Sequence, residues 1–309
     1  MISVVIPVYN EAKNITMLYR RMEGVLDKLN LKREFIFVND GSHDQSEAIL
    51  IDLADKNNDV KYINLSRNFG HQIAVSAGLD YASGDKIIII DGDGQDPPEI
   101  IEKMYIKSLE GFEVVYARRI NRKGESLLKK TTAKWFYRLM RKITRIDIPV
   151  DTGDFRIIDR SVVDQLKIMP EKHKFLRGQI AWIGFNQTAV EFEREERQAG
   201  TSGYSYRKMI RLAIDGITSF SNWPLRVATI SGFLFSFVGF VLIGYTLYSR
   251  YYTESYEPGW ASQMITIIFI GGIQLIGIGI IGEYISRMND NLRNRPLYVV
   301  KDTNLQKEK

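Results

Sequence analysis

The chain of 309 residues contains no cysteine, and this absence excludes several kinds of site. Without thiols there can be no disulfide scaffold, no cysteine nucleophile and no metal centre with sulfur ligands. A basic segment is also missing in front of the first apolar run, residues 2–8, so we expect no signal peptide. The composition, with 45% apolar and 26% charged residues, is that of an ordinary globular protein. Any membrane-embedded part must therefore be local.

Charged side chains are absent from two long runs near the C-terminal end, residues 227–249 and 258–282. Each run is longer than the roughly 20 residues that a helix needs to cross the hydrocarbon core of a bilayer. Two buried core helices are the alternative, but a core helix normally carries a polar stripe and these runs are apolar all round. The sequence therefore predicts two transmembrane helices.

Positive charge predicts the orientation of these helices. Basic residues lie at the outer ends of the two runs, at Arg226, Arg287, Arg293, Arg295 and Lys301. The loop between the runs has Arg250 as its single basic residue, beside two glutamates. Lys and Arg favour the cytoplasmic side of a membrane. We therefore expect a multi-pass protein of the inner (plasma) membrane, with both termini in the cytoplasm and a short outer hairpin.

The first 117 residues alternate short apolar runs with amphipathic stretches. The strand candidates are residues 2–8, 34–38, 60–65, 86–90 and 113–116, and the helical patterns are residues 11–29, 44–56, 71–82 and 98–109. Apolar strands that alternate with helices indicate an α/β fold with a mostly parallel sheet covered on both faces. Ligands bind such sheets at the carboxyl ends of the strands. Functional side chains are therefore expected directly after the strands.

Between residues 121 and 145, basic side chains alternate with large apolar ones at helical spacing. The basic residues that interleave with the large apolar ones are Lys129, Lys130, Lys134, Arg138, Arg141, Lys142 and Arg145. A helix with this composition is typical of the membrane interface, although a solvated basic helix packed on its own domain is the alternative. A second amphipathic stretch, residues 204–220, precedes the first apolar run. Because two spanning helices place these surfaces beside lipid, nucleic acid is not expected as a partner.

Acidic residues follow the fourth apolar run, where residues 87–98 read IIIIDGDGQDPP. Asp91 and Asp93 flank a glycine at the point where the isoleucines end. Two carboxylates on such a turn suit Mg²⁺ or Mn²⁺ held together with a substrate diphosphate, and the metal would offset negative charge on a departing diphosphate. An Asp-x-Asp triplet alone also occurs in ordinary turns. Its position at the end of an apolar strand favours the metal site.

Two further predicted strands end in polar residues. Residues 35–42 read FIFVNDGS and place Asp40 at the end of a strand. Asn-Asp-Gly can form a hairpin turn, but the helical pattern that follows favours a strand–loop–helix unit. The first strand ends in PVYNE, which adds Tyr9 and Glu11. Because these strands are consecutive in the predicted sheet, their ends are expected to form one site.

Taken together, these segments resemble the inverting A-type glycosyltransferases of family 2. Within that family the chain is similar to the polyprenyl-phosphate sugar transferases, which include dolichyl-phosphate mannose synthases and bacterial undecaprenyl-phosphate glucosyltransferases. The matching segments are VVIPVYNE at 4–11, FVNDGS at 37–42, SRNFG at 66–70, DGDGQDPPE at 91–99, TGDFR at 152–156, RQAGTSGYS at 197–205 and the two apolar runs. The combination covers nearly the whole chain and is specific, although no single segment is.

The resemblance implies a division of the chain into four parts. Residues 1–200 would form a cytoplasmic A-type glycosyltransferase domain with a Rossmann-like, mostly parallel sheet. Residues 201–225 would form juxtamembrane amphipathic helices, and residues 226–284 two transmembrane helices with a short outer loop. Residues 285–309 would be a cytoplasmic tail. Small residues in both apolar runs permit close helix contacts, so a homo-oligomer is a hypothesis.

The resemblance also assigns roles to residues. The nucleoside of the donor would be held by Pro7, Tyr9, Glu11 and Asp40. The ribose and diphosphate would lie near Asp91, and the metal ligands would be Asp93 and Gln95 together with Asp91. The acceptor phosphate would be held by Arg119, Lys129 and Arg197. Many relatives have a lysine where Gly203 stands here, which weakens any phosphate contact at that position.

Asp154 is the residue that the resemblance assigns to orienting or deprotonating the acceptor. A structural acid paired with Arg156 is the alternative. An acceptor phosphate is already ionised at pH 7 and hardly needs a base. We therefore expect positioning of the acceptor, and not general-base catalysis, to be the role of Asp154.

The reaction implied is the transfer of a hexose from a nucleotide sugar to polyprenyl (undecaprenyl) phosphate, giving a lipid-linked sugar for the modification of a cell-envelope glycan. UDP-glucose is the expected donor, because the arrangement of the two apolar runs and the TGDFR segment look most like those of the glucosyltransferases. UDP-N-acetylglucosamine, GDP-mannose and amino-arabinose donors remain open. A processive polysaccharide synthase would be expected to carry Gln-x-x-Arg-Trp and more spans, and the sequence contains neither. A non-catalytic membrane scaffold would be expected to lose the acids Asp91, Asp93 and Asp154, and all three are present. The sequence therefore disfavours both alternatives.

Overall fold

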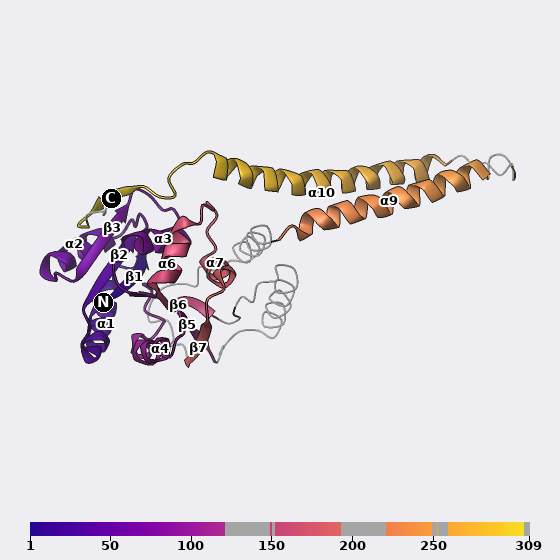
Figure 1. The fold of residues 1–309 in the computed structure, drawn as a ribbon. Coiled ribbons are helices and arrows are strands. Elements are labelled where there is room, and N and C mark those ends of the chain that lie inside the picture. Colours follow the sequence, from indigo (N-terminus) through magenta and orange to yellow (C-terminus); the bar gives the residue numbers. More distant parts are fainter. Residues whose placement is uncertain (121–148, 150–151, 193–220, 249–251, 253–258, 306–309) are drawn as a thin grey trace. The chain divides into compact units, whose positions relative to one another are not determined.

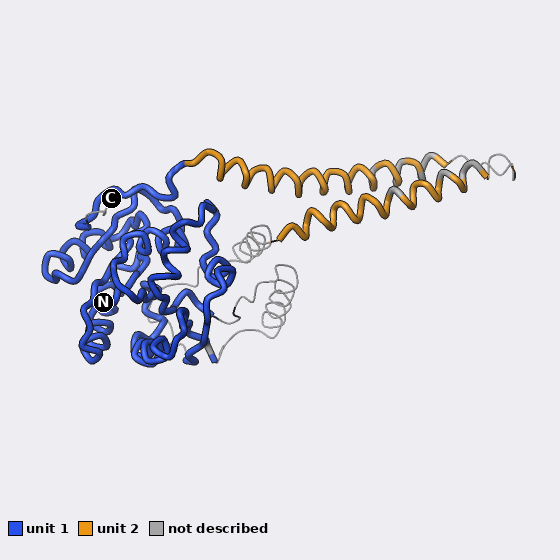
Figure 2. Tube along the Cα trace, in the orientation of Figure 1, with its two compact units in different colours: residues 1–209, 295–309 blue, residues 210–294 orange. Residues whose placement is uncertain are grey.

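A computed structural model describes the chain except for residues 121–148, 150–151, 193–220, 249–251, 253–258 and 306–309 (Figure 1). The chain forms two compact units (Figure 2). The first unit contains residues 1–209 and 295–309, and the second contains residues 210–294. The two amphipathic stretches expected at residues 121–145 and 204–220 lie outside the described residues.

A mixed sheet of eight strands forms the centre of the first unit. The strands are β1 Ile2–Val8, β2 Arg33–Asn39, β3 Val60–Leu65, β4 Lys86–Ile89, β5 Val114–Arg119, β6 Thr152–Asp159, β7 Gln187–Phe192 and β8 Val300–Thr303. Their order is β7-β5-β6-β4-β1-β2-β3-β8. Neighbouring strands are parallel from β4 through β1 and β2 to β3, and between β5 and β7. Antiparallel pairs join β6 to both β4 and β5, and β8 to β3.

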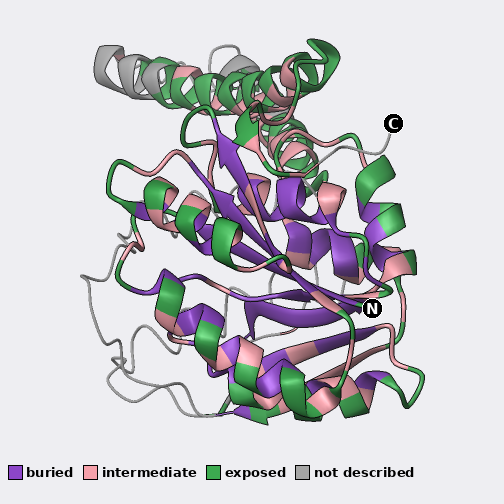
Figure 3. Cartoon of the chain, turned by 90° about the vertical axis from the view of Figure 1, so that its left-hand side faces the viewer, coloured by how far each residue is buried: buried purple, intermediate pink, exposed green. Residues whose placement is uncertain are grey.

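Helices cover both faces of this sheet, as Figure 3 shows by the buried strands between helices with exposed outer sides. One core cluster includes residues of α1 Ile15–Leu29, α2 Ser46–Lys56 and α4 Ile101–Ser108, which follows the short 3₁₀ helix η1 Pro98–Ile100. The other includes residues of α3 His71–Tyr81, α6 Arg160–Ile168 and α7 Leu176–Ile183. Along β1, Val4 and Ile6 belong to the first cluster and Val5 to the second. This alternation is the period of two that a strand buried on both faces requires.

The expected α/β fold class is confirmed, and the expected elements differ from the observed ones mainly at their ends. The first helix begins at Ile15, four residues later than expected, and the second at Ser46. Three strands, β6, β7 and β8, have no counterpart among the sequence-based elements, and β7 pairs parallel with β5. Strand β6 inserts antiparallel between β4 and β5, and residues 300–303 of the expected C-terminal tail return to the sheet as β8.

The second unit contains two long helices, α9 Trp223–Tyr248 and α10 Trp260–Leu292. Both are long and apolar enough to cross a membrane. Their apolar side chains are exposed, with 75% of Phe233 and 71% of Leu275 accessible. The helices contact each other through Phe235 and Phe269, whose ring centroids are 5.6 Å apart. Exposed apolar side chains over this length agree with a lipid environment.

Candidate active site

The carboxyl ends of β1, β2 and β4 lie together because these strands are parallel neighbours in the sheet, and two glycines let the loops at this edge approach their surroundings closely. A Cβ atom on Gly92, after β4, would lie 2.7 Å from the carbonyl oxygen of Pro7 in β1. A Cβ atom on Gly41, after β2, would lie 2.6 Å from the backbone nitrogen of Asn68, and Gly41 has a φ of +66°. Any larger residue would push these loops apart. Gly92 thus brings the loop after β4 close to β1, and Gly41 brings the loop after β2 close to the segment before α3.

Asp91 follows β4 at this edge, in a half-buried position. Its side chain is 25% exposed, and its buried Oδ1 atom has no hydrogen-bond partner among the described residues. Burial raises the pKa of Asp91, and the charges of Asp154 and Asp93 act in the same direction, against the opposing effect of His71. An oxygen without a hydrogen-bond partner among the described residues, in surroundings that oppose its negative charge, indicates a place for a bound cation.

Asp154, on the antiparallel strand β6, is buried and has three side-chain donors. Its Oδ2 atom lies 2.9 Å from Nε2 of His71 and accepts a hydrogen bond of 2.9 Å from Nε2 of Gln72. Its Oδ1 atom accepts a hydrogen bond of 2.7 Å from Nε of Arg177. Although burial opposes the effect, Arg177 and His71 hold the pKa of Asp154 well below its usual range. Asp154 is thus an ionised carboxylate whose two oxygens are both hydrogen-bonded.

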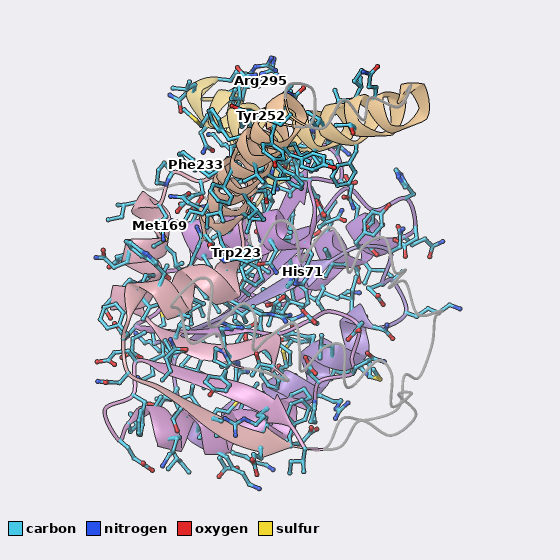
Figure 4. All side chains as sticks on the ribbon, turned by 90° about the vertical axis from the view of Figure 1, so that its right-hand side faces the viewer. His71, Met169, Trp223, Phe233, Tyr252 and Arg295 are labelled. Carbon is cyan, nitrogen blue, oxygen red and sulfur yellow. The ribbon has the colours of Figure 1, made fainter. Side chains whose placement is uncertain are left out.

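His71, labelled in Figure 4, begins α3 and lies close to both acids. Its Nε2 atom is 2.9 Å from Asp154 and 3.5 Å from Oδ1 of Asp91. Burial lowers the pKa of His71, but Asp91 and Asp154 outweigh it and raise the pKa to about 9. A charged imidazole therefore separates two carboxylates that would otherwise repel each other.

Arg156 is also buried beside Asp154, but it contacts the main chain more closely than the carboxylate. It donates hydrogen bonds to the carbonyl oxygens of Asp154, at 3.2 Å, and of Gly153, at 3.0 Å. Its Nη2 atom is 3.8 Å from Oδ1 of Asp154. Burial lowers the pKa of Arg156 to about 10. The structural pair expected as the alternative is thus secondary to the closer contacts with Arg177 and His71.

The residues at this edge form two groups of candidate ligands for a divalent cation, the second of which would require His71 to lose its proton. The predicted ligands Asp91, Asp93 and Gln95 share one turn, in which Oδ1 of Asp93 accepts a hydrogen bond of 3.1 Å from the backbone nitrogen of Gln95. Ligand atoms of His71, Asp91 and Asp154 form a second group and lie within 4.8 Å of one another. Asp91 belongs to both groups, and its Oδ1 atom lacks a hydrogen-bond partner among the described residues. Carboxylate and amide oxygens are ligands suited to Mg²⁺ or Mn²⁺.

The predicted nucleoside-binding residues lie at the same edge and have different surroundings. Tyr9 is 43% exposed, with its ring 6.4 Å from that of His43. Pro7 is buried at the end of β1. Glu11 accepts a hydrogen bond of 2.5 Å from Nδ2 of Asn14, in the turn before α1. Of these residues, the exposed ring of Tyr9 is the one most open to a ligand, and nucleoside binding stays a prediction.

Asp40 stabilises the loop before α3 through hydrogen bonds to its backbone. Its two carboxylate oxygens accept hydrogen bonds from the backbone nitrogens of Phe69, at 2.7 Å, and Gly70, at 2.9 Å. Burial raises the pKa of Asp40, against these two bonds. The contacts fix the loop directly before α3. Asp40 thereby positions the start of the helix that carries His71, and its predicted contact with the nucleoside stays a prediction.

The predicted acceptor-phosphate residues fall largely outside the described part of the chain. Arg119 ends β5, but its side chain is not described, and Lys129, Arg197 and Gly203 lie outside the described residues. Within the described part, the cations that contact the Asp154 carboxylate most closely are Arg177 and His71, with Arg156 further away. Sequence reasoning missed Arg177 and His71. His71 had one available signal, its position directly after SRNFG, whereas Arg177 is one of 42 basic residues and follows no strand end.

Comparison with known proteins adds family matches and close relatives. Residues 3–167 match Glycosyl transferase family 2, and residues 223–288 match the GtrB C-terminal hairpin. The uncharacterized glycosyltransferase YkcC of Bacillus subtilis (strain 168) is 50% identical over 298 residues, covering 96% of this chain and 92% of that protein. The bactoprenol glucosyl transferase of Shigella phage SfII is 40% identical over 300 residues, covering 97% of each chain. Among solved structures, the chain is similar to the glucosyl-3-phosphoglycerate synthase from Mycobacterium tuberculosis in complex with Mn²⁺, uridine-diphosphate-glucose and phosphoglyceric acid. The two chains are 17% identical, with a TM-score of 0.48. The match covers 71% of this chain and 77% of that chain.

Proposed function

The chain belongs to glycosyl transferase family 2, and on that premise we propose that it transfers glucose from UDP-glucose to undecaprenyl phosphate with inversion. Relatives named bactoprenol glucosyl transferase match it over nearly their whole length, including the C-terminal hairpin. The observation that carries the proposal is the meeting of Asp91 and Asp154 through His71 at the carboxyl edge of the sheet. Asp91 would serve the donor diphosphate and Asp154 the acceptor phosphate.

On the donor side, a bound Mg²⁺ or Mn²⁺ would supply positive charge to the leaving diphosphate. Asp91, Asp93 and Gln95 would hold this cation. Tyr9 would offer its exposed ring to the base, while Pro7, Glu11 and Asp40 would complete the nucleoside pocket. The tight approach of Gly92 to β1 would let the diphosphate lie close to the backbone.

On the acceptor side, an oxygen of the acceptor phosphate would attack the anomeric carbon. The bond from that carbon to the β-phosphate oxygen would break, and UDP would leave with the electron pair. The attacking oxygen carries no proton that must be removed, so Asp154 is needed for geometry. Arg177 and His71 would offset the charge of Asp154 beside an anionic acceptor. Arg119, Lys129 and Arg197 would hold the acceptor phosphate itself.

Membrane attachment would place the lipid acceptor beside this site. We propose that α9 and α10 span the inner membrane, with the family 2 domain and both termini in the cytoplasm, as the distribution of basic residues favours. Juxtamembrane helices within residues 121–145 and 201–225 would hold the lipid head group. We also propose self-association through Gly232, Gly239, Gly271 and Gly272, and crosslinking in mild detergent that gave only monomer would contradict it.

The test is a transfer assay with the purified full-length chain, Mg²⁺ or Mn²⁺, undecaprenyl phosphate and radiolabelled nucleotide sugars. We expect label from UDP-glucose in the organic phase, and little from UDP-N-acetylglucosamine or GDP-mannose. The Asp93→Asn variant is the control and should lose most of this transfer. Label from another donor would correct the sugar and keep the reaction. No label from any donor, with the lipid shown to be accessible, would contradict the proposed reaction.

A further inference from the structure

The side chain of Gln72 joins two helices to the buried carboxylate of Asp154. Gln72 lies in the first turn of α3, and its Nε2 atom donates a hydrogen bond of 2.9 Å to Oδ2 of Asp154. Its Oε1 atom accepts a hydrogen bond of 3.0 Å from the backbone nitrogen of Leu176, the first residue of α7. Because one end of the amide donates and the other accepts, a flip of the amide would lose both bonds. The orientation of Gln72 is therefore fixed.

The bond to Leu176 also bears on the second oxygen of Asp154. Arg177 is the next residue of α7 and donates from Nε to Oδ1 of Asp154 at 2.7 Å. Gln72 thus bonds directly to Oδ2 of Asp154. It also bonds to the backbone of Leu176, the neighbour of Arg177, and Arg177 holds Oδ1. Within α3, the main-chain carbonyl oxygen of Gln72 accepts a hydrogen bond of 2.8 Å from Oγ of Ser76.

We propose that Gln72 is a positioning residue for sugar transfer, which sets the orientation of the Asp154 carboxylate through its amide and ties α3 to α7 around it. The inference rests on the proposed function. Gln72 does not itself touch the reacting atoms. Its contribution is to hold one rotamer of a buried acid at the place where the acceptor must lie in line with the sugar. A displacement of about 1 Å at such a position can lower a rate about 100-fold.

The substitution Gln72→Glu separates this role from a structural one. Glutamate has the same shape and keeps an oxygen that can accept from the backbone of Leu176, so the tie between the helices is retained. It replaces the amide nitrogen by a second oxygen, which in its ionised form faces Oδ2 of Asp154 without a hydrogen to donate. We expect kcat to fall about 10- to 100-fold, with the KM for the nucleotide sugar changed less than about threefold.

Gln179 offers a matched control on α7. Its Nε2 atom donates to Oε2 of Glu171 at 3.2 Å, so Gln179→Glu also places a carboxylate against a carboxylate. This contact lies away from Asp154 in the hydrogen-bond network, and kcat should stay near that of the wild type. Equal values of kcat and KM in the two variants would overturn the positioning role.

A second measurement needs no substrate and so separates this inference from the proposed reaction. The double variant Gln72→Glu with Asp154→Asn reverses the donor and the acceptor of the bond. We expect it to recover part of the Tm that Gln72→Glu alone loses. Purely additive changes in Tm would overturn the inference even if the wild type transferred no sugar. Recovery of Tm together with an unchanged kcat in Gln72→Glu would also overturn it, since the contact would then be structural only.

Discussion

At the scale of single residues, the site joins two acids with opposite tendencies. Asp91 has a raised pKa and an oxygen without a hydrogen-bond partner among the described residues, whereas Asp154 has a lowered pKa and donors at both oxygens. His71 contacts both. The charge on Asp91 thus lowers the stability of the folded chain. For an acid whose pKa is raised on folding, this loss develops as the pH rises from the unfolded pKa and is complete above the folded pKa. Such a cost is expected where a cation is to be bound.

The substitution Asp91→Asn should therefore separate stability from function. Removing the charge takes away the desolvation cost and the repulsion from Asp154, so we expect an unchanged or higher Tm at pH 7 in the presence of EDTA. A metal ion that binds only the folded state raises Tm, and this rise with Mn²⁺ should be reduced or lost in the variant. Transfer should fall at least about 100-fold.

Differential scanning fluorimetry with and without Mn²⁺ provides the check. The wild type in EDTA and in Mn²⁺ is the reference for both changes. A variant that lost Tm in EDTA, or one that kept the full rise with Mn²⁺, would contradict the assignment of Asp91 as a ligand.

At the scale of elements, helix α3 carries both His71 and Gln72, so its position decides the site. The helix lies directly on the sheet at Gly78, where an added Cβ atom would overlap Cγ1 of Val5 and lie 3.1 Å from Cγ2 of Val38. Interiors at native packing density have no room for such an atom without a shift of the backbone or of its neighbours. A glycine thus sets the distance between the helix and the strands whose ends form the active site.

We predict that Gly78→Ala destabilises the first unit by about 1–3 kcal/mol, because overpacking outweighs the better helix propensity of alanine. Gly24 in α1 is the matched control, since a Cβ atom there meets nothing within 4 Å. Gly24→Ala should stabilise by about 0.5–1 kcal/mol. Urea unfolding of both variants tests the pair. A gain of stability in Gly78→Ala similar to that in Gly24→Ala would show that α3 can move away from the sheet at little cost.

At the scale of the whole molecule, the chain returns to its first unit after the helices of the second. Residues 300–303 form β8 against β3, and Lys301 and Tyr298 make side-chain contacts with Glu47 and Asp80 at 2.8 Å each. The strand covers an edge of the sheet that would otherwise present unpaired backbone groups. The first unit is therefore assembled from both ends of the sequence.

Removal of residues 295–309 should lower the Tm of the first unit and promote aggregation, because β3 then becomes an exposed edge. The substitution Lys301→Ala is the control and should leave Tm unchanged, since an exposed ion pair contributes little to stability. Thermal unfolding with light-scattering detection measures both effects. An unchanged Tm after the truncation would mean that β8 is dispensable for the fold.

The sequence by itself determined the elements and one edge of the site. Buried strands and amphipathic helices have local periods, and two long apolar runs specify helices suited to a bilayer. Asp40 and Asp91 could be placed at one edge because consecutive parallel strands end on the same side of a sheet. The resemblance singled out Asp154, although no periodicity or spacing predicted its surroundings.

Only the tertiary structure decided which side chains meet Asp154 and how the sheet is completed. His71 and Gln72 lie 83 and 82 residues from Asp154 in the chain, and Leu176 lies 104 residues from Gln72. The antiparallel insertion of β6 and the return of β8 bring such distant segments together. A local pattern records whether a residue is buried and in which kind of element. The choice of its partners depends on the packing of the whole unit, and no short stretch of sequence contains that information.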